Sequence, residues 1–262
     1  MQILLPPSEG KTSPAKGKPL DGDTLPLPSL QEPRRQVLEA LTTLCAGDPE
    51  LARTTLGLTP GQSDELLRNQ GLWTAPTAPA WQVYTGVLYG QLDAPSLTAA
   101  QRRWLSERVL IASALFGFVG LSEPIPAYRL SGDTSLPGVG ALAGFWRTHL
   151  VPLLEATSGL VIDLRSGTYV KLAPLTPALA ERTVAVRVLQ KMPSGPPKLI
   201  THFNKATKGR IVRELALQRK TLRTASELAQ LVTALDADVT VVAPAKKGPL
   251  LLDIVVDSPF HG

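Results

Sequence analysis

The first segment with side chains that could bind or react with a ligand follows a short apolar run at residues 2–5. It consists of Glu9, Gly10, Lys11 and Thr12. A Gly-Lys-Thr triplet that follows a strand is typical of phosphate-binding loops, but those loops need a second glycine upstream. Leu5 occupies that position, which excludes a Walker motif. A lysine and a carboxylate at the carboxyl end of a strand remain, and open α/β sheets bind their ligands there. A solvent-facing turn is the competing interpretation.

A Pro-Gly turn at residues 136–144 is the second segment. Gly138 and Gly140 bracket Val139, so the turn exposes backbone amides at the start of the next helix, where a phosphate oxygen can bind. The pattern resembles the hairpin of helix-hairpin-helix DNA-binding motifs, which requires a first helix at residues 128–134. An ordinary turn before an amphipathic helix is the alternative.

Basic residues concentrate in one window, residues 198–223. The window holds eight Lys or Arg and one Glu, 8 − 1 = +7, and the whole chain carries +5, so the remaining residues sum to 5 − 7 = −2. Asn204 is predicted to cap a helix on which Lys205 and Lys208 share a face, at the end where the helix dipole favours an anion. Gly209 lowers helix propensity, so we expect it to serve a close backbone approach. The window predicts a phosphate-binding surface, with a solvated helix face as the alternative.

The fourth segment follows a predicted buried strand and brings Asp163, Ser166, Tyr169 and Lys171 to one sheet edge, as an active site requires. A strand end with a Ser-Gly turn is the alternative. Polar residues at strand ends and turns also allow an enzyme that acts on a nucleotide, a nucleobase or a damaged base. In one version, a lysine with a lowered pKa forms a Schiff base with an abasic sugar. The candidate catalytic residues are Glu9, Lys11, Tyr84, Arg129, Asp163, Tyr169 and Lys205.

Composition excludes several classes of protein. Hydrophobic residues make up 44% and charged residues 19%, a globular balance unlike that of a disordered chain. Cys45 is the one cysteine and the three histidines stand far apart, so we expect no disulfide, no metal site and no cofactor. The longest uncharged apolar stretch, residues 109–122, is shorter than the roughly 20 residues of a membrane-spanning helix. The N-terminus has no signal-peptide pattern, so we expect a cytoplasmic protein without membrane contact.

Periodicity predicts short strands that alternate with helices. We therefore expect an α/β (α+β mixed) fold, a single domain over residues 1–262 in which helices cover a mixed sheet. Strands are predicted at residues 2–5, 109–116, 160–164, 184–189, 198–203, 239–243 and 250–256, the last two paired with each other. Helices are predicted at residues 34–45, 49–56, 63–69, 79–92, 99–108, 142–154, 205–218 and 226–235.

Six short segments occur together in one known family. They are residues 3–12, 83–86, 126–130, 145–146, 161–164 with Ser166 and Tyr169, and 203–210. In order and spacing they resemble the YaaA peroxide-stress family over nearly the whole chain. The resemblance implies a single compact domain with an unusual α/β architecture, the cantaloupe-type fold, around a basic cleft that binds double-stranded and distorted DNA. It also implies a cytoplasmic role in limiting oxidative damage, including iron-dependent damage to DNA, during peroxide stress.

The leading hypothesis is therefore a DNA-binding protein of the peroxide-stress response. Few Asn or Gln residues stand in the basic window, so the protein is expected to bind phosphates largely independently of sequence. An enzyme that uses the same cleft is the first alternative, and a module that binds a small anionic metabolite is the second. The predicted DNA- or phosphate-binding residues are Lys11, Arg129, Gly138, Gly140, Lys171, Lys205, Lys208, Arg210 and Arg213.

Overall fold

A mixed β-sheet runs through the computed structural model, which describes residues 1–192, 194–199, 203–235, 238–242 and 248–256. The strand order is β11 (Asp238–Val242), β12 (Leu250–Val256), β9 (Thr183–Gln190), β8 (Val161–Asp163), β1 (Gln2–Leu5), β3 (Val109–Ser113) and β4 (Gly117–Gly120), and β10 (Lys198–Leu199) pairs with β9. Two small sheets pair β2 (Ala78–Pro79) with β5 (Pro124–Ile125) and β6 (Ser135–Leu136) with β7 (Gly140–Ala141). The expected α/β class is confirmed.

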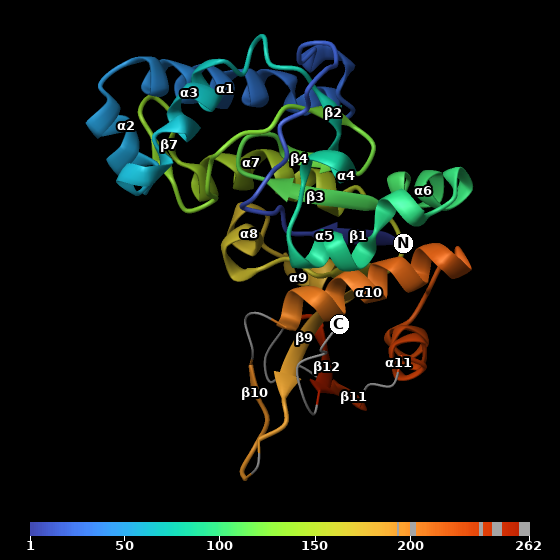
Figure 1. Ribbon diagram of the computed structural model, residues 1–262. Helices are drawn as coiled ribbons and strands as arrows, with labels where there is room; N and C mark the ends of the chain where they lie inside the picture. Colours follow the sequence, from blue (N-terminus) through green and yellow to red (C-terminus); the bar gives the residue numbers. More distant parts are fainter. Residues whose placement is uncertain (193, 200–202, 236–237, 243–247, 257–262) are drawn as a thin grey trace.

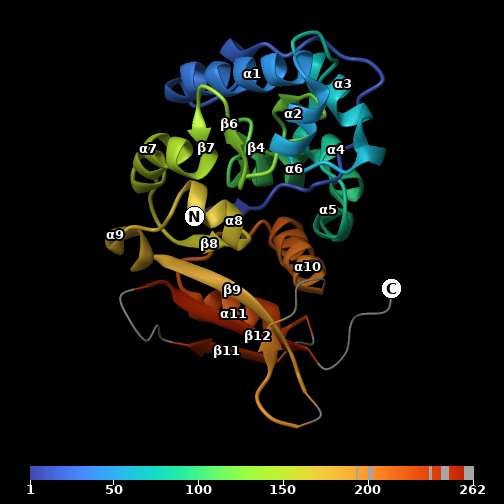
Figure 2. The same cartoon turned by 90° about the vertical axis from the view of Figure 1, so that its left-hand side faces the viewer.

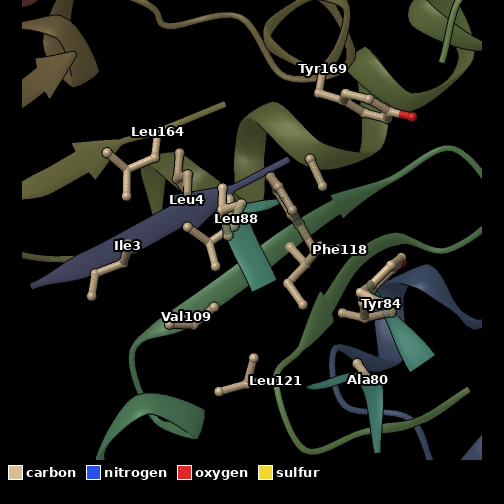
Figure 3. Close-up of a cluster of buried hydrophobic side chains, with 14 of the residues drawn as sticks. Ile3, Leu4, Ala80, Tyr84, Leu88, Val109, Phe118, Leu121, Leu164 and Tyr169 are labelled. Carbon is tan, nitrogen blue, oxygen red and sulfur yellow. The ribbon is translucent and has the colours of Figure 1, made fainter. Parts of the chain in front are cut away.

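The central strands are parallel and the outer pairs are antiparallel. β1 lies parallel to β3 and β8, and β9 lies parallel to β8 and β12, whereas β3/β4 and β11/β12 are antiparallel. Ile3, Leu4 and Leu5 are fully buried, as expected for a parallel strand that is covered on both faces. Figure 3 shows Leu4, Leu88 and Phe118 gathered around β1 and β3 in the core. Because β1, β8 and β9 run in one direction, their carboxyl ends face the same edge.

Eleven helices in the described ranges cover this sheet and form a cap at one end (Figure 2). At the end opposite β11 and β12 lie the three helices α1 (Gln31–Ala46), α2 (Pro49–Thr55) and α3 (Asp64–Gln70). The others are α4 (Ala80–Val83), α5 (Val87–Leu92), α6 (Ala99–Ser106), α7 (Leu142–Glu155), α8 (Gly167–Leu172), α9 (Pro177–Ala180), α10 (Phe203–Gln218) and α11 (Ala225–Thr233). Short 3₁₀ turns lie at η1 (Gly22–Thr24), η2 (Pro28–Leu30), η3 (Pro60–Gln62) and η4 (Ala94–Ser96). None of the described helices is both long and apolar enough to span a bilayer.

The single helix predicted at residues 79–92 is wrong, because the chain there forms two helices. α4 ends at Val83, Tyr84 is extended and pairs with Lys11 in an isolated bridge, and α5 begins after Gly86, which has φ +90°. The amide of Thr12 also donates to the Val83 carbonyl at 2.9 Å. A long-range contact with the N-terminal loop therefore overrides the local helical periodicity.

One further strand prediction fails at a turn. The strand predicted at residues 109–116 ends at Ser113, and the chain returns as β4 from Gly117, where φ is +71° and a Cβ would lie 2.7 Å from the Trp146 ring. The strand predicted at residues 198–203 reaches only Leu199 among the described residues, and residues 200–202 lie outside them.

The first turn of α10 also differs from the prediction. α10 already includes Phe203, so Asn204 lies within the first helical turn and is not the N-cap. The predicted close approach at Gly209 is confirmed, since a Cβ there would overlap the Leu88 carbonyl oxygen of α5. Gly209 thus lets α10 lie directly against α5, as Figure 1 shows.

Candidate functional site

A cleft of about 420 Å³ opens at the carboxyl edge of the central strands. Asp163 of β8 pairs in register with Leu4 of β1 and with Ala185 of β9. Just beyond this row lie Leu164, Val186 and Pro6, which line the cleft. The loop after β1, the start of α8 and the first turns of α10 enclose it. Its polar lining residues are Glu9, Arg165, Ser166, Tyr169, Arg187, Asn204, Lys205 and Lys208. The structure thus brings together five residues that the sequence analysis proposed for chemistry or phosphate binding, namely Glu9, Ser166, Tyr169, Lys205 and Lys208.

Lys208 is a buried cation in this cleft, with 6% of its surface exposed. Burial lowers its pKa to about 8, although the nearby Asp163 carboxylate acts in the opposite direction. Its Nζ donates one long hydrogen bond, 3.5 Å to the Arg165 carbonyl oxygen, and no described carboxylate lies within ion-pair distance. A buried charge without a counter-ion is unfavourable, so Lys208 favours an anion at this position.

Lys205 and Asn204 occupy the first turn of α10 at the cleft wall. Lys205 is exposed, and among the described residues its side chain has no hydrogen bond or ion pair. The Oδ1 atom of Asn204 is buried without a hydrogen-bond partner in the described part of the chain. Because α10 has 16 residues, the positive end of its dipole adds to the field of the two lysines.

Asp163 forms an ion pair with Arg165, a residue that the sequence analysis did not single out. Arg165 Nε and Nη2 donate to the two Asp163 carboxylate oxygens at 2.9 and 2.8 Å, and both side chains are almost fully buried. Arg165 Nη1 also donates to the Ala173 carbonyl at 2.8 Å. The placement of Asp163 at the sheet edge is confirmed, but its carboxylate is engaged in a structural ion pair. The signal for this pair in the sequence was the spacing of two residues between Asp163 and Arg165, which places both side chains on one face of an extended chain.

Lys11 anchors the loop after β1 and does not line the cleft. Its Nζ donates to the carbonyl oxygens of Ser8 at 2.9 Å and Glu9 at 3.4 Å and lies 4.1 Å from the centre of the Tyr128 ring. Burial lowers its pKa to about 8, while Glu9 raises it and Arg129 lowers it further. The lysine of the Gly-Lys-Thr triplet is thus half-buried, and its amine binds carbonyl oxygens of its own loop.

Hydrogen bonds of buried tyrosine and serine hydroxyls lie next to the loop after β1, and one of them connects directly to it. Tyr84 Oη lies 2.9 Å from Tyr128 Oη, which lies 2.8 Å from Ser113 Oγ, and Tyr89 Oη donates to the Pro6 carbonyl at 2.8 Å. Burial raises the pKa of Tyr84 well above its usual range, so the phenol stays protonated. Tyr84 is therefore a positioning residue for the loop, and Tyr128, Ser113 and Tyr89 were not recognised from the sequence.

Arg129 connects this loop to the cleft through Glu9. Its Nη1 lies 3.1 Å from the Glu9 carboxylate. Asn69 fixes the backbone of Arg129, since its Nδ2 donates to the Arg129 carbonyl at 2.7 Å and its Oδ1 accepts from the amide at 2.9 Å. Glu9 and Arg129 therefore form a neutral pair at the cleft edge.

Comparison with known proteins places these features in a family. The family model described as "Peroxide stress protein YaaA" matches residues 1–235. The chain belongs to the YaaA peroxide-stress family. A UPF0246 protein of Streptomyces coelicolor is 44% identical over 259 residues and covers 98% of both chains. A UPF0246 protein of Corynebacterium glutamicum is 41% identical over 238 residues, 89% of this chain and 92% of the relative, and one of Methylibium petroleiphilum is 33% identical over 153 residues, 56% and 59%.

Besides Lys11 and Arg129, three further cations predicted to bind phosphate in this YaaA-family chain lie outside the cleft lining. Lys171 is exposed on α8 and lies 3.4 Å from the Asp133 carboxylate. Arg213 donates to the Leu92 and Asp93 carbonyls at 3.1 Å each and to a serine hydroxyl in η4, so it ties α10 to the α5–η4 junction. Arg210 is half-buried and has an interaction partner of its own.

The two turn glycines lie elsewhere in this YaaA-family fold. Gly138 and Gly140 adopt φ values of +79° and +83° in the hairpin between β6 and β7, beside the acidic residues Glu39 and Asp48 of the α1–α2 region. Residues 128–134 form no helix, so the first helix of a helix-hairpin-helix motif is missing. The hairpin turn is thus confirmed, but it stands apart from the cleft. The described residues also contain no group of three or more His, Cys, Asp or Glu arranged to hold a metal ion.

Proposed function

We propose that this YaaA-family chain acts in peroxide stress as a DNA-binding protein that holds a DNA phosphate in the cleft at Lys205 and Lys208. The buried ammonium of Lys208, which has no carboxylate partner among the described residues, is the observation that supports this most directly. A phosphate oxygen supplies the missing negative charge and a short charge-assisted hydrogen bond. Lys205, exposed one helical turn away, provides a second donor.

Contacts of this kind position DNA without reading its sequence. Asn204 is the one side-chain amide that lines the cleft among the described residues. We therefore expect affinities that differ little between duplexes of different sequence and that fall steeply as salt rises.

The test is the salt dependence of duplex binding, measured by fluorescence polarisation. Replacing both lysines, Lys205→Ala with Lys208→Ala, should weaken binding and lower the slope of log K against log salt by about 2 units at most, since each phosphate that is no longer neutralised reduces the slope by about 0.9. The matched control, Lys16→Ala with Lys18→Ala, also removes two positive charges, from an exposed segment near the N-terminus. An affinity independent of salt, or a slope equally reduced by both double variants, contradicts the proposal.

Lys11 favours a second candidate function, an enzyme acting on a nucleotide, a nucleobase or a damaged DNA base. Burial lowers the pKa of Lys11 to about 8, so part of the amine is neutral and nucleophilic near neutral pH. With an abasic sugar, Nζ would add to the C1′ aldehyde and water would leave, which gives an imine. Borohydride should then trap a covalent adduct of the wild-type chain with abasic DNA and none with Lys11→Met. Absence of the wild-type adduct removes this candidate.

A further inference from the structure

The charged side chains of the cleft cancel in pairs except for two. Three charged side chains of the lining form ion pairs with oppositely charged residues. Glu9 pairs with Arg129 at 3.1 Å, Arg165 with Asp163 at 2.8 Å, and Arg187 with Asp253 at 2.6 Å. Lys205 and Lys208 have no carboxylate partner among the described residues, so the cleft with its partners carries a net charge of 1 + 1 = +2.

A charge of this size distinguishes two kinds of phosphate. A phosphodiester inside a DNA strand carries a single negative charge. A terminal phosphomonoester carries about −1.5 to −2 at pH 7 and presents three acceptor oxygens. The two lysines therefore match a phosphomonoester more closely than an internal phosphate.

The dimensions of the cleft favour a single nucleotide unit. Its volume of about 420 Å³ lies in the range of about 300–1,000 Å³ that small-molecule sites occupy. Pro6, Pro7, Leu164 and Val186 give it apolar walls suited to a sugar or a base. A duplex, in contrast, needs an open groove about as wide as the double helix.

Asn204 indicates that the ligand carries a hydrogen-bond donor next to its phosphate. Its Oδ1 atom is buried and accepts no hydrogen bond from any described residue. An acceptor that stays unpaired is unfavourable, and a ligand hydroxyl or amine would satisfy it. Inorganic phosphate lacks the additional sugar or base donors that a nucleotide offers.

We infer that the cleft binds one nucleotide that carries a terminal phosphomonoester, with the phosphate at Lys205 and Lys208 and a sugar or base donor at Asn204. This inference rests on the proposed phosphate-binding function and specifies its ligand. The same chemistry occurs at a phosphorylated end of a DNA strand and in a free mononucleotide, and the experiment separates these two sources.

The experiment measures binding of the full chain to one labelled duplex prepared with a 5′-phosphate, with a 3′-phosphate, or with hydroxyl ends only. A phosphorylated end should bind at least about tenfold more tightly than the hydroxyl ends. Unlabelled deoxynucleoside 5′-monophosphate should compete, whereas the deoxynucleoside should not. Competition by the monophosphate identifies a free nucleotide as a ligand, and preference without competition restricts the ligand to DNA ends.

Two single variants test the assigned contacts. Asn204→Ala should lower affinity for the monophosphate by about fivefold and leave competition by inorganic phosphate unchanged, because only the nucleotide offers the extra donor. Lys205→Gln should remove most of the preference for phosphorylated ends. Equal effects of Asn204→Ala on both ligands would overturn the role given to Asn204.

The remaining outcomes separate this inference from the proposed function. Equal binding of phosphorylated and hydroxyl-ended duplexes, with no competition by the monophosphate, overturns the inference and leaves duplex binding intact. Binding of the monophosphate with no binding of any duplex supports the pocket and contradicts DNA binding.

Discussion

Replacing Lys208 with methionine should stabilise the folded chain, although the position is buried in α10. The wild-type ammonium is 6% exposed and has no carboxylate partner among the described residues. Methionine has a similar unbranched stem without the charge, so the change removes the desolvation cost and keeps the packing. A residue that lowers stability and lies at a cleft wall indicates a binding role.

The size of the effect follows from the pKa of Lys208. Burial lowers this pKa from 10.5 to about 8. At 1.36 kcal/mol per pKa unit, the charged lysine lowers the free energy of unfolding at pH 7 by about 3 kcal/mol. For a chain of this length, Lys208→Met should raise the Tm by about 6–12 °C.

The pH dependence has a defined sign. Between pH 8 and 10.5 the unfolded chain keeps the Lys208 proton that the folded chain has released, so wild-type stability rises with pH in this window. The advantage of methionine should therefore shrink from about 3 kcal/mol at pH 7 to about 1.5 kcal/mol at pH 9.5. Lys11 has a pKa lowered in the same direction, but it is present in both proteins and cancels in the comparison.

Urea denaturation at pH 7 and pH 9.5 measures these differences, with Lys205→Met as the control. Lys205 is exposed one turn away on the same helix, so its replacement should change stability little. Phosphate binding should fall in both variants. If Lys208→Met destabilises the chain at pH 7, or its advantage does not shrink at pH 9.5, the account of Lys208 as a buried, unpaired cation is refuted.

Two packing predictions concern other positions. Gly209→Ala should destabilise the chain by about 1–3 kcal/mol despite its better helix propensity, because the new Cβ overlaps the Leu88 carbonyl. The control Gly144→Ala, in α7 with open space around the Cβ, should instead stabilise it by about 0.5–1 kcal/mol, and thermal denaturation of both variants checks the pair. Asp163→Asn leaves Arg165 buried without its counter-charge and should lower the free energy of unfolding by about 3–5 kcal/mol in urea titration; a loss below about 1 kcal/mol would contradict the structural role of this ion pair.

Elements with local signals were predictable from the sequence. Thr98 caps α6 through a reciprocal pair of bonds with Gln101, and the predicted helix starts where the structure places it. The apolar periodicity of α1 and the pairing of β11 with β12 were also predicted and are confirmed. These features depend on residues that are close in sequence.

Elements fixed by distant partners were not predictable. The chain leaves the helical path at Tyr84 because Lys11 and Thr12 pair with this segment from the N-terminal loop. The helix α8 was missed because its six residues are too short to show an amphipathic period. The sequence did not reveal Arg165 as the partner of Asp163, because polar side chains at a strand end can bind either a substrate or one another, and only their positions in space distinguish the two.

The basic residues of the window 198–223 also show which properties the sequence determines and which the tertiary structure determines. The sequence alone determined that seven net positive charges concentrate in residues 198–223 and that the chain has the motifs of the YaaA family. Only the tertiary structure decided which of these cations have partners, since Arg213 meets Asp93 and neighbouring carbonyls some 120 residues away in the chain. It also buried Lys208 without a carboxylate and left Lys205 exposed beside it. Ion pairing depends on distances of a few ångströms between remote segments, and neither composition nor spacing contains those distances.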